Sequence, residues 1–158
     1  MRRALALPLV AVTLLLAGCA PTVSLTPAPQ ATSTRCAGVV VRLPDRIGTL
    51  DRRETDAQGT GAWGNPAAVT LTCGVLTAEA SGIPCQTVGG VDWLLEEERI
   101  AGADRQVLTT FGRQPGTQVV LDPKAVQAIT VLETLSDPIA AATQRDGRKC
   151  LADSDTSS

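Results

Sequence analysis

Alternation of hydrophobic and polar residues predicts β-strands in the middle of the chain. Residues 69–73 read Val-Thr-Leu-Thr-Cys, so every second side chain is apolar, as in a strand with one buried face. Gly89-Gly90 precedes the largely apolar segment 91–95, which predicts a second strand. We expect residues 96–99, three Glu and one Arg, to carry this strand into solvent, with Gly102 ending the element.

A β-hairpin is predicted further along the chain. The apolar-rich segments 106–111 and 117–121 are separated by Gly112-Arg113-Gln114-Pro115-Gly116. Glycine and proline favour a tight connection there, which suits an antiparallel pair of strands. This places Arg113 at the tip of the hairpin.

A helix is predicted after the hairpin. Asp122-Pro123 is typical of a helix N-cap followed by proline at the first helical position. Ser136-Asp137-Pro138 is expected to interrupt this helix, after which another turn continues to Thr143. Apolar residues recur at helical spacing at Ala125, Val126, Ala128, Ile129, Val131, Leu132 and Leu135.

The segments before residue 69 give weaker signals. Residues 36–43 fit either a buried strand or a helical turn, and Pro44 ends them. Residues 45–61 hold many charges and few large apolar side chains, which predicts a polar connection leading into a loop at residues 61–66. Together these elements predict an α+β fold, a small antiparallel sheet with a C-terminal helix packed on one face.

The first 19 residues have the layout of a lipoprotein signal peptide. Met1-Arg2-Arg3 precedes an apolar run of 13 residues, too short to cross a bilayer as a helix. Leu16-Ala17-Gly18-Cys19 resembles the lipobox of bacterial lipoproteins, in which the cysteine is acylated and the chain is cut just before it. We therefore expect residues 1–18 to be removed and Cys19 to bind membrane lipid at the outer face of the cytoplasmic membrane. The alternative is a secreted protein in which Cys19 is incidental.

The remaining boundaries follow from composition. Residues 19–34 are rich in Pro, Thr and Ser and carry no charge, which predicts a tether that reaches at most ~50 Å beyond the lipidated cysteine. Residues 152–158 are small and polar, which predicts a disordered tail. Residues 35–151 are left as a single globular domain of ordinary size.

Composition excludes several classes of function. The chain has no histidine, so a Ser-His-Asp triad and a His-ligated zinc site are excluded. Once residues 1–18 are removed, 12 basic and 16 acidic side chains remain, and aromatic residues make up only 2% of the sequence. Nucleic acid is therefore not an expected partner. We expect no metal and no cofactor.

The other four cysteines predict two disulfides. Cys36, Cys73, Cys85 and Cys150 are an even number in a chain expected to be exported, and their spacing is not that of a Cys-x-x-Cys redox pair. Three pairings are possible. Sequence proximity favours Cys73 with Cys85, and Cys36 with Cys150 would then join the two ends of the domain.

A series of short motifs follows one another along the domain. They are Cys36, Leu43-Pro44, Arg52-Arg53, Ala62-Trp63-Gly64-Asn65-Pro66, Leu71-Thr72-Cys73-Gly74, Cys85, Gly90-Val91-Asp92-Trp93 and Thr110-Phe111-Gly112-Arg113-Gln114-Pro115. As a set they resemble an uncharacterised actinobacterial envelope family catalogued as domain of unknown function 3515. The resemblance covers roughly residues 36–143 and implies an exported or membrane-associated protein with no assigned activity, so it transfers no catalytic residue.

Four side chains are candidates for a binding site. Trp63 lies among glycines and a proline, so it either projects from a loop as a stacking anchor or fills the core. Arg52, Arg53 and Arg113 are candidates for binding an anion, because the guanidinium group matches carboxylate and phosphate geometry. The alternative is that these arginines are solvated or paired with acidic residues of the chain.

The expected function is that of a lipid-anchored, non-enzymatic domain that binds an envelope protein or a cell-wall component. The alternative is a hydrolase of cell-wall glycan that uses carboxylates, for which Asp92 and Glu96 to Glu98 are the available groups. Consecutive residues of a strand point to opposite faces, so this acidic run does not converge on one bond, and we lean against an enzyme.

Overall fold

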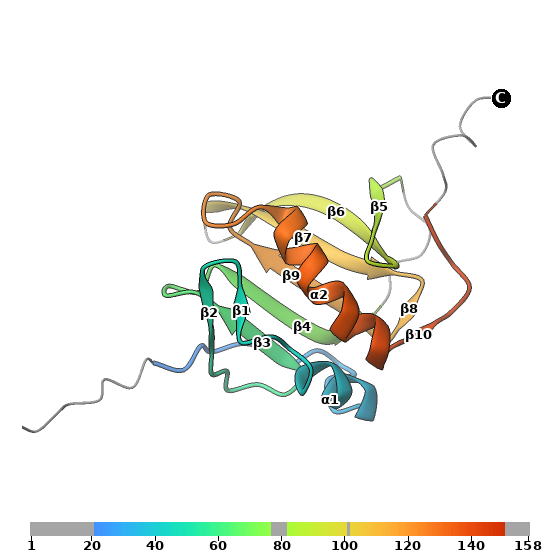
Figure 1. Ribbon diagram of the computed structural model, residues 1–158, viewed down its shortest axis with the longest axis horizontal. Coiled ribbons are helices and arrows are strands. Elements are labelled where there is room, and N and C mark those ends of the chain that lie inside the picture. The colour runs from blue at the N-terminus through green and yellow to red at the C-terminus, as the bar shows by residue number, and fades with distance from the viewer. Residues whose placement is uncertain (1–20, 77–81, 101, 151–158) are drawn as a thin grey trace, which may run out of the picture.

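The computed structural model describes residues 21–76, 82–100 and 102–150 (Figure 1). The predicted signal peptide at 1–18, the predicted lipidation site Cys19 and the predicted tail at 152–158 lie outside these ranges. None of the helices within them is both long and apolar enough to cross a membrane.

The main sheet has eight strands, so it is larger than the small sheet that the sequence predicted. All of its neighbouring strands pair antiparallel. A separate two-stranded sheet pairs β8 (Arg113–Gln114) with β10 (Gln144–Arg145). The order of the main sheet is β1 (Arg46–Ile47), β2 (Leu50–Arg53), β3 (Thr60–Trp63), β4 (Val69–Val75), β9 (Gly116–Leu121), β7 (Ala103–Phe111), β6 (Val91–Ile100) and β5 (Cys85–Val88).

Three strand predictions are confirmed. β4 alternates between buried and partly exposed residues, with Val69, Leu71 and Cys73 fully buried. The predicted hairpin is the pair β7 and β9, in which Leu108 lies opposite Val119. The strand predicted at 91–95 is present but runs on to Ile100, because β7 pairs with its whole length.

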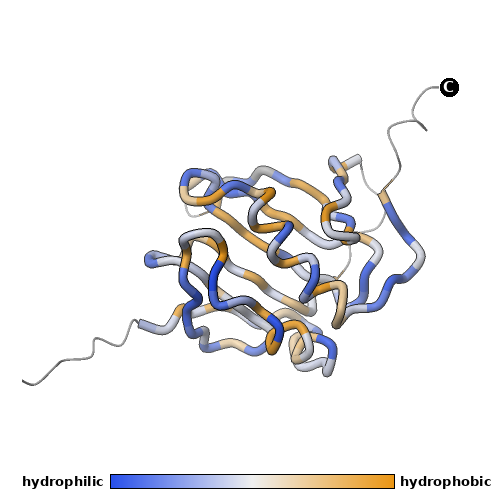
Figure 2. Tube along the Cα trace, in the orientation of Figure 1, coloured by the Kyte–Doolittle hydropathy of each residue, from blue (hydrophilic) through white to orange (hydrophobic). Residues whose placement is uncertain are grey.

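Two helices cover one face of the sheet. α1 (Thr34–Val40) and α2 (Ala128–Ala142) lie side by side in front of the strands (Figure 1). Figure 2 shows apolar residues along the central strands and α2, and mostly hydrophilic ones around β1, β2 and the C-terminal segment. The core between the helices and the sheet contains both tryptophans, each with none of its surface exposed.

The N-terminal third of the domain differs most from the prediction. Residues 45–61 form β1, β2 and the start of β3 rather than a polar connection, and Ile47 is fully buried. β1 and β2 are short and lie at one end of the sheet, so few of their side chains need to be apolar. The undecided segment at 36–43 is helical in its first half, where the Ser33 hydroxyl caps α1 by accepting the Cys36 N–H.

The prediction for α2 was wrong at its start and at the expected interruption, whereas its expected end near Thr143 is confirmed. The Asp122 carbonyl and carboxylate form a separate turn with Lys124, Ala125 and Val126, so the helix begins only at Ala128. It then continues through Pro138 without the predicted interruption. Proline lacks the N–H that would bind four residues back, but burial of Ile139 against the core favours continuation.

The disulfides join Cys36 to Cys73 and Cys85 to Cys150, so the favoured pairing was wrong. The sheet explains the difference. Cys73 lies on β4 and Cys85 on β5, and β9, β7 and β6 lie between them. Four strand spacings of about 4.8 Å separate the two residues by roughly 19 Å, whereas the Cα atoms of a disulfide lie within about 7 Å.

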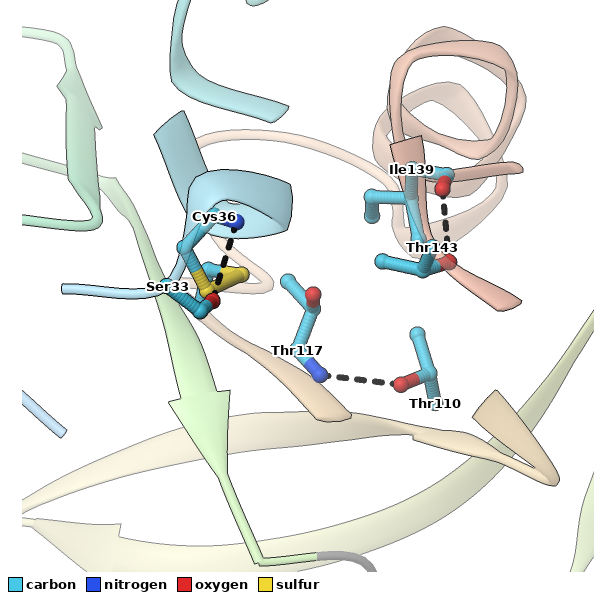
Figure 3. Close-up of a disulfide and its surroundings, with 7 residues drawn as sticks. Ser33, Cys36, Thr110, Thr117, Ile139 and Thr143 are labelled. Carbon is cyan, nitrogen blue, oxygen red and sulfur yellow. Dashed lines mark hydrogen bonds between the residues drawn. A yellow bond between two sulfur atoms is a disulfide. The ribbon is translucent and has the colours of Figure 1, made fainter. Parts of the chain in front are cut away.

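The first bridge connects the helical layer to the centre of the sheet. The Cα atoms of Cys36 on α1 and Cys73 on β4 are 5.5 Å apart. Figure 3 shows Cys36 beside Ser33, with Thr117 of β9 on the other side of the bridge. The second bridge, with Cα atoms 5.6 Å apart, holds the C-terminal segment against β5.

Peptide mapping without reductant tests the connectivity. The chain has no Lys or Arg between Cys73 and Cys85, so trypsin alone leaves both in one peptide, but cleavage at Glu79 separates them. The protein is denatured at acidic pH and digested with trypsin and with a protease that cleaves after glutamate. We expect one peptide pair that links Cys36 to Cys73 and another that links Cys85 to Cys150. A Cys73–Cys85 peptide would contradict the fold. Replacing Cys36 and Cys73 together by Ala is expected to lower the free energy of unfolding by about 2–5 kcal/mol in urea titrations.

Candidate functional site

Trp63 is a core residue and not an exposed anchor. None of its surface is accessible, and its Nε1–H donates to the Pro44 carbonyl at 3.0 Å. The neighbouring glycine accounts for the misleading sequence signal. A Cβ atom on Gly61 would lie 3.1 Å from the Trp63 ring and 2.6 Å from Leu43, so Gly61 makes room for the indole rather than forming a loop.

Arg113 is buried, with 5% of its surface exposed, so its predicted position at an open hairpin tip was wrong. β10 pairs with β8 and covers the tip. The Arg113 guanidinium donates to the Gly90 carbonyl at 3.0 Å and to the Thr143 hydroxyl at 3.3 Å. Burial lowers the pKa of Arg113, and the charge of nearby Arg145 lowers it further. The side chain joins β8 to the end of α2 and to the turn before β6.

Arg52 and Arg53 are the two candidate residues that the fold brings to an open cleft. The cleft has a volume of about 420 Å³ and lies between α1, residues 31–33 and residues 52–60. Both arginines are partly exposed at the end of β2. Glu54 is the one carboxylate among the described residues that line it.

Each of these arginines is held in place by backbone carbonyls. Arg52 donates to Leu43 at 3.1 Å and to Val40 at 3.2 Å, and so holds the C-terminal end of α1 against β2. Arg53 donates to Gly64 at 2.9 Å and to Pro21 at 2.5 Å. A guanidinium has five N–H donors, so each group keeps donors beyond these two bonds. Within the described ranges, neither arginine forms an ion pair with a carboxylate.

The N-terminal segment lies along the domain, so the prediction of a free tether does not hold for residues 21–33. Val23 forms a parallel bridge with Thr55, and its N–H donates to the Glu54 carbonyl at 2.8 Å. Further along, the Gln30 N–H donates to the Gly74 carbonyl at 3.0 Å. Backbone groups make most of these contacts, which is why the side-chain pattern gave no signal.

Asp56 is the residue of this region that the sequence analysis missed. Its Oδ1 accepts the Leu25 N–H at 2.9 Å, and its Oδ2 accepts the Ser24 hydroxyl at 2.7 Å. These bonds favour the charged carboxylate and hold the pKa of Asp56 below its ordinary value of 3.8, with the Leu25 N–H as the larger cause. An aspartate followed by a glycine-containing turn has no motif that would identify it as a clamp for a distant segment.

Asp92 and Glu96, two of the carboxylates considered for hydrolysis, do not line a common hollow among those described. Asp92 accepts the Thr87 hydroxyl at 2.6 Å and the Cys150 N–H at 3.0 Å, so both of its oxygens have structural partners. Glu96 lies at a separate hollow of about 250 Å³ with Pro84, Leu95, Gln106 and Leu108. Among the residues that the structure describes, no three His, Cys, Asp or Glu side chains are grouped to hold a metal ion.

Substitution of Arg113 is expected to affect folding. Arg113→Ala leaves the Gly90 carbonyl and the Thr143 hydroxyl without this buried donor, so the free energy of unfolding should fall by about 1–3 kcal/mol. Arg46→Ala is the matched control, because Arg46 is largely exposed and pairs only with Asp51 in the described structure. Its effect should stay within about 0.5 kcal/mol in the same urea titrations. Equal effects of the two variants would contradict the buried role of Arg113.

The docking of residues 21–25 is expected to depend on pH through Asp56. Because the pKa of Asp56 is lowered in the folded protein, its contribution is fully present above the ordinary value near 3.8 and is lost as pH falls through the lowered value. Amide hydrogen exchange should therefore show loss of protection at Leu25 at acidic pH before the core opens. In Asp56→Ala, the Leu25 amide should be unprotected at neutral pH as well. Retained protection at Leu25 in Asp56→Ala would contradict the clamp.

Comparison with known proteins agrees with the motifs in the sequence. Residues 4–147 match the family described as "Protein of unknown function (DUF3515)", which is most of the chain. No curated protein and no solved structure matches the chain. Because the match spans most of its length, the chain is a member of the DUF3515 family, whose function is unknown.

Proposed function

We propose that this protein is an exported lipoprotein, anchored by acyl chains on Cys19 to the outer face of the cytoplasmic membrane. Its globular domain acts as a non-enzymatic binding or accessory module. The ligand is an acidic group of an envelope protein or cell-wall component, bound in the cleft beside Arg52 and Arg53. The lipobox at residues 16–19 supports the anchor, and the cleft supports the binding role.

The observation that carries this proposal is the pair of arginines on the wall of the cleft. The volume of about 420 Å³ suits a small molecule or one group of a larger ligand. The backbone carbonyls that hold Arg52 and Arg53 fix their positions without neutralising their charge. Guanidinium groups held in this way bind carboxylate or phosphate by charge-assisted hydrogen bonds.

Hydrolysis of glycan has less support. That chemistry uses two carboxyl groups about 5–10 Å apart on either side of the scissile bond. Of the three hollows described, two are lined by one carboxylate each, Glu54 and Glu96, and the third is lined by none. The geometry of the described hollows therefore supports a binding function better than glycan hydrolysis.

Anion binding is tested with inorganic phosphate and citrate as probes, by the rise in melting temperature of the purified protein. Bound ligand stabilises the folded state by mass action, so a concentration-dependent rise is expected for the native sequence. Arg52→Gln and Arg53→Gln should each weaken binding by about 1–3 kcal/mol, as expected for loss of a hydrogen bond to a charged group. Arg35→Gln, an exposed residue of α1 that does not line the cleft, is the matched control.

Melts without ligand separate a loss of stability from a loss of binding. If phosphate and citrate raise the melting temperature of both cleft variants as much as that of Arg35→Gln, the cleft is not an anion site. If the native protein shows no rise at all with either probe, acidic ligands of this kind are excluded.

A further inference from the structure

The N-terminal segment brings the predicted lipid attachment site to the surface of the domain. The Pro21 carbonyl is held by Arg53, and Cys19 precedes Pro21 by only two residues. Consecutive Cα atoms are 3.8 Å apart, so the Cα of Cys19 lies within ~8 Å of that of Pro21. A free tether of the predicted length would allow ~50 Å. Docking of the segment therefore shortens the free chain between the lipid and the domain from most of the tether to a few residues.

The docking is distributed over the whole segment. Its first contact is the hydrogen bond from Arg53 to the Pro21 carbonyl. Glu54 and Asp56 then accept hydrogen bonds from residues 23–25. The last contact is at Ala31, which is 5% exposed.

Two glycines leave the space in which Ala31 packs. A Cβ on Gly74 would lie 2.5 Å from the Ala31 nitrogen, and a Cβ on Gly59 would lie 3.1 Å from the Ala31 Cβ. Both glycines have positive φ, of +101° and +70°, and Gly74 lies at a register shift between β4 and β9. The backbone of the sheet is shaped to receive this segment, so residues 21–33 are part of the folded domain.

Charge does not select this orientation. Residues 21–25 and 53–56 together hold one Arg and two acidic residues, so their formal charge is -1 and an anionic bilayer does not attract them. The short link to the acyl chains proposed on Cys19 is what holds this part of the domain at the membrane.

We propose that the domain lies directly on the bilayer, with an anchor face formed by residues 21–25 and 53–56 against the lipid headgroups. This inference rests on the proposed acylation of Cys19. The anchor face shares Arg53, Glu54 and Thr55 with the cleft, so the cleft opens beside the headgroups. The partner of this face is the phospholipid surface that holds the acyl chains, and a ligand of the cleft must reach the cleft at the membrane surface.

The two tryptophans of the chain provide native reporters of this orientation. Trp63 lies on β3, next to Gly64, whose carbonyl binds the anchor-face residue Arg53. Trp93 lies on β6, four strand spacings away, or roughly 19 Å across the sheet. Trp93→Phe leaves Trp63 as the single donor, and Trp63→Phe leaves Trp93.

The experiment measures energy transfer from tryptophan to a dansyl-headgroup lipid. The lipidated full chain is reconstituted in vesicles of phosphatidylglycerol and phosphatidylethanolamine. We expect transfer from Trp63 to be several-fold stronger than from Trp93. Arg53 and Asp56 together hold residues 21–25 and are called the clamp here. Releasing the clamp with Arg53→Ala and Asp56→Ala together should reduce energy transfer from Trp63 towards the level of Trp93. The matched control, Arg46→Ala with Asp137→Ala, removes the same residue types elsewhere on the exposed surface and should leave transfer unchanged.

The protein with both tryptophans gives a second measurement that does not depend on the folding of the Trp→Phe variants. Its total transfer should fall on release of the clamp and not in the control. Equal transfer from Trp63 and Trp93, or no change on release, in protein whose intact mass shows acylated Cys19, would overturn the docked orientation and leave the lipoprotein assignment standing. Absence of acyl mass at Cys19, with release of the protein from membranes, would overturn both.

Discussion

The pairing of β4 with β9 is the contact on which the rest of the structure depends. It joins the strands of the N-terminal half, β1 to β4, to those of the C-terminal half, β5, β6, β7 and β9, in the centre of one sheet. Its register places Leu71 opposite Val119 and Cys73 opposite Thr117. A shift by one residue would turn Leu71 and Cys73 away from the helices, because side chains alternate between the two faces of a strand. The hydrophobic core, the first disulfide and the backbone surface that receives the N-terminal segment all depend on this register.

Four arginines of the described residues share one role, which is to bind backbone carbonyls in turns and where strands and helices end, whereas Arg46, Arg105 and Arg148 pair with aspartates. Arg52, Arg53, Arg113 and Arg145 all donate to carbonyl groups of turns or element ends. Such carbonyls have no partner within a helix or sheet, and a guanidinium reaches two of them at once. What separates these arginines is exposure. Arg113 is enclosed and acts within the fold, whereas Arg52 and Arg53 retain donors beside an open cleft.

The cleft and the N-terminal segment share contacts with the end of β2 and with the residues that follow it. Arg53 lines the cleft and binds the Pro21 carbonyl, and Glu54 lines the cleft and accepts the Val23 N–H. The wall of the cleft and the docking site of the segment therefore share the same short stretch of chain.

The sequence by itself determined the features that depend on local pattern: the alternating strand at residues 69–73, the hairpin of β7 and β9, the presence of a C-terminal helix and an even set of cysteines. Only the tertiary structure decided which cysteines pair, that Trp63 and Arg113 are enclosed and that residues 21–33 bind the domain. Each of these depends on segments far apart in the chain meeting across the sheet, through backbone groups that every residue carries. Hydrophobic periodicity reports which face of an element is buried, but it does not report which distant segment covers that face.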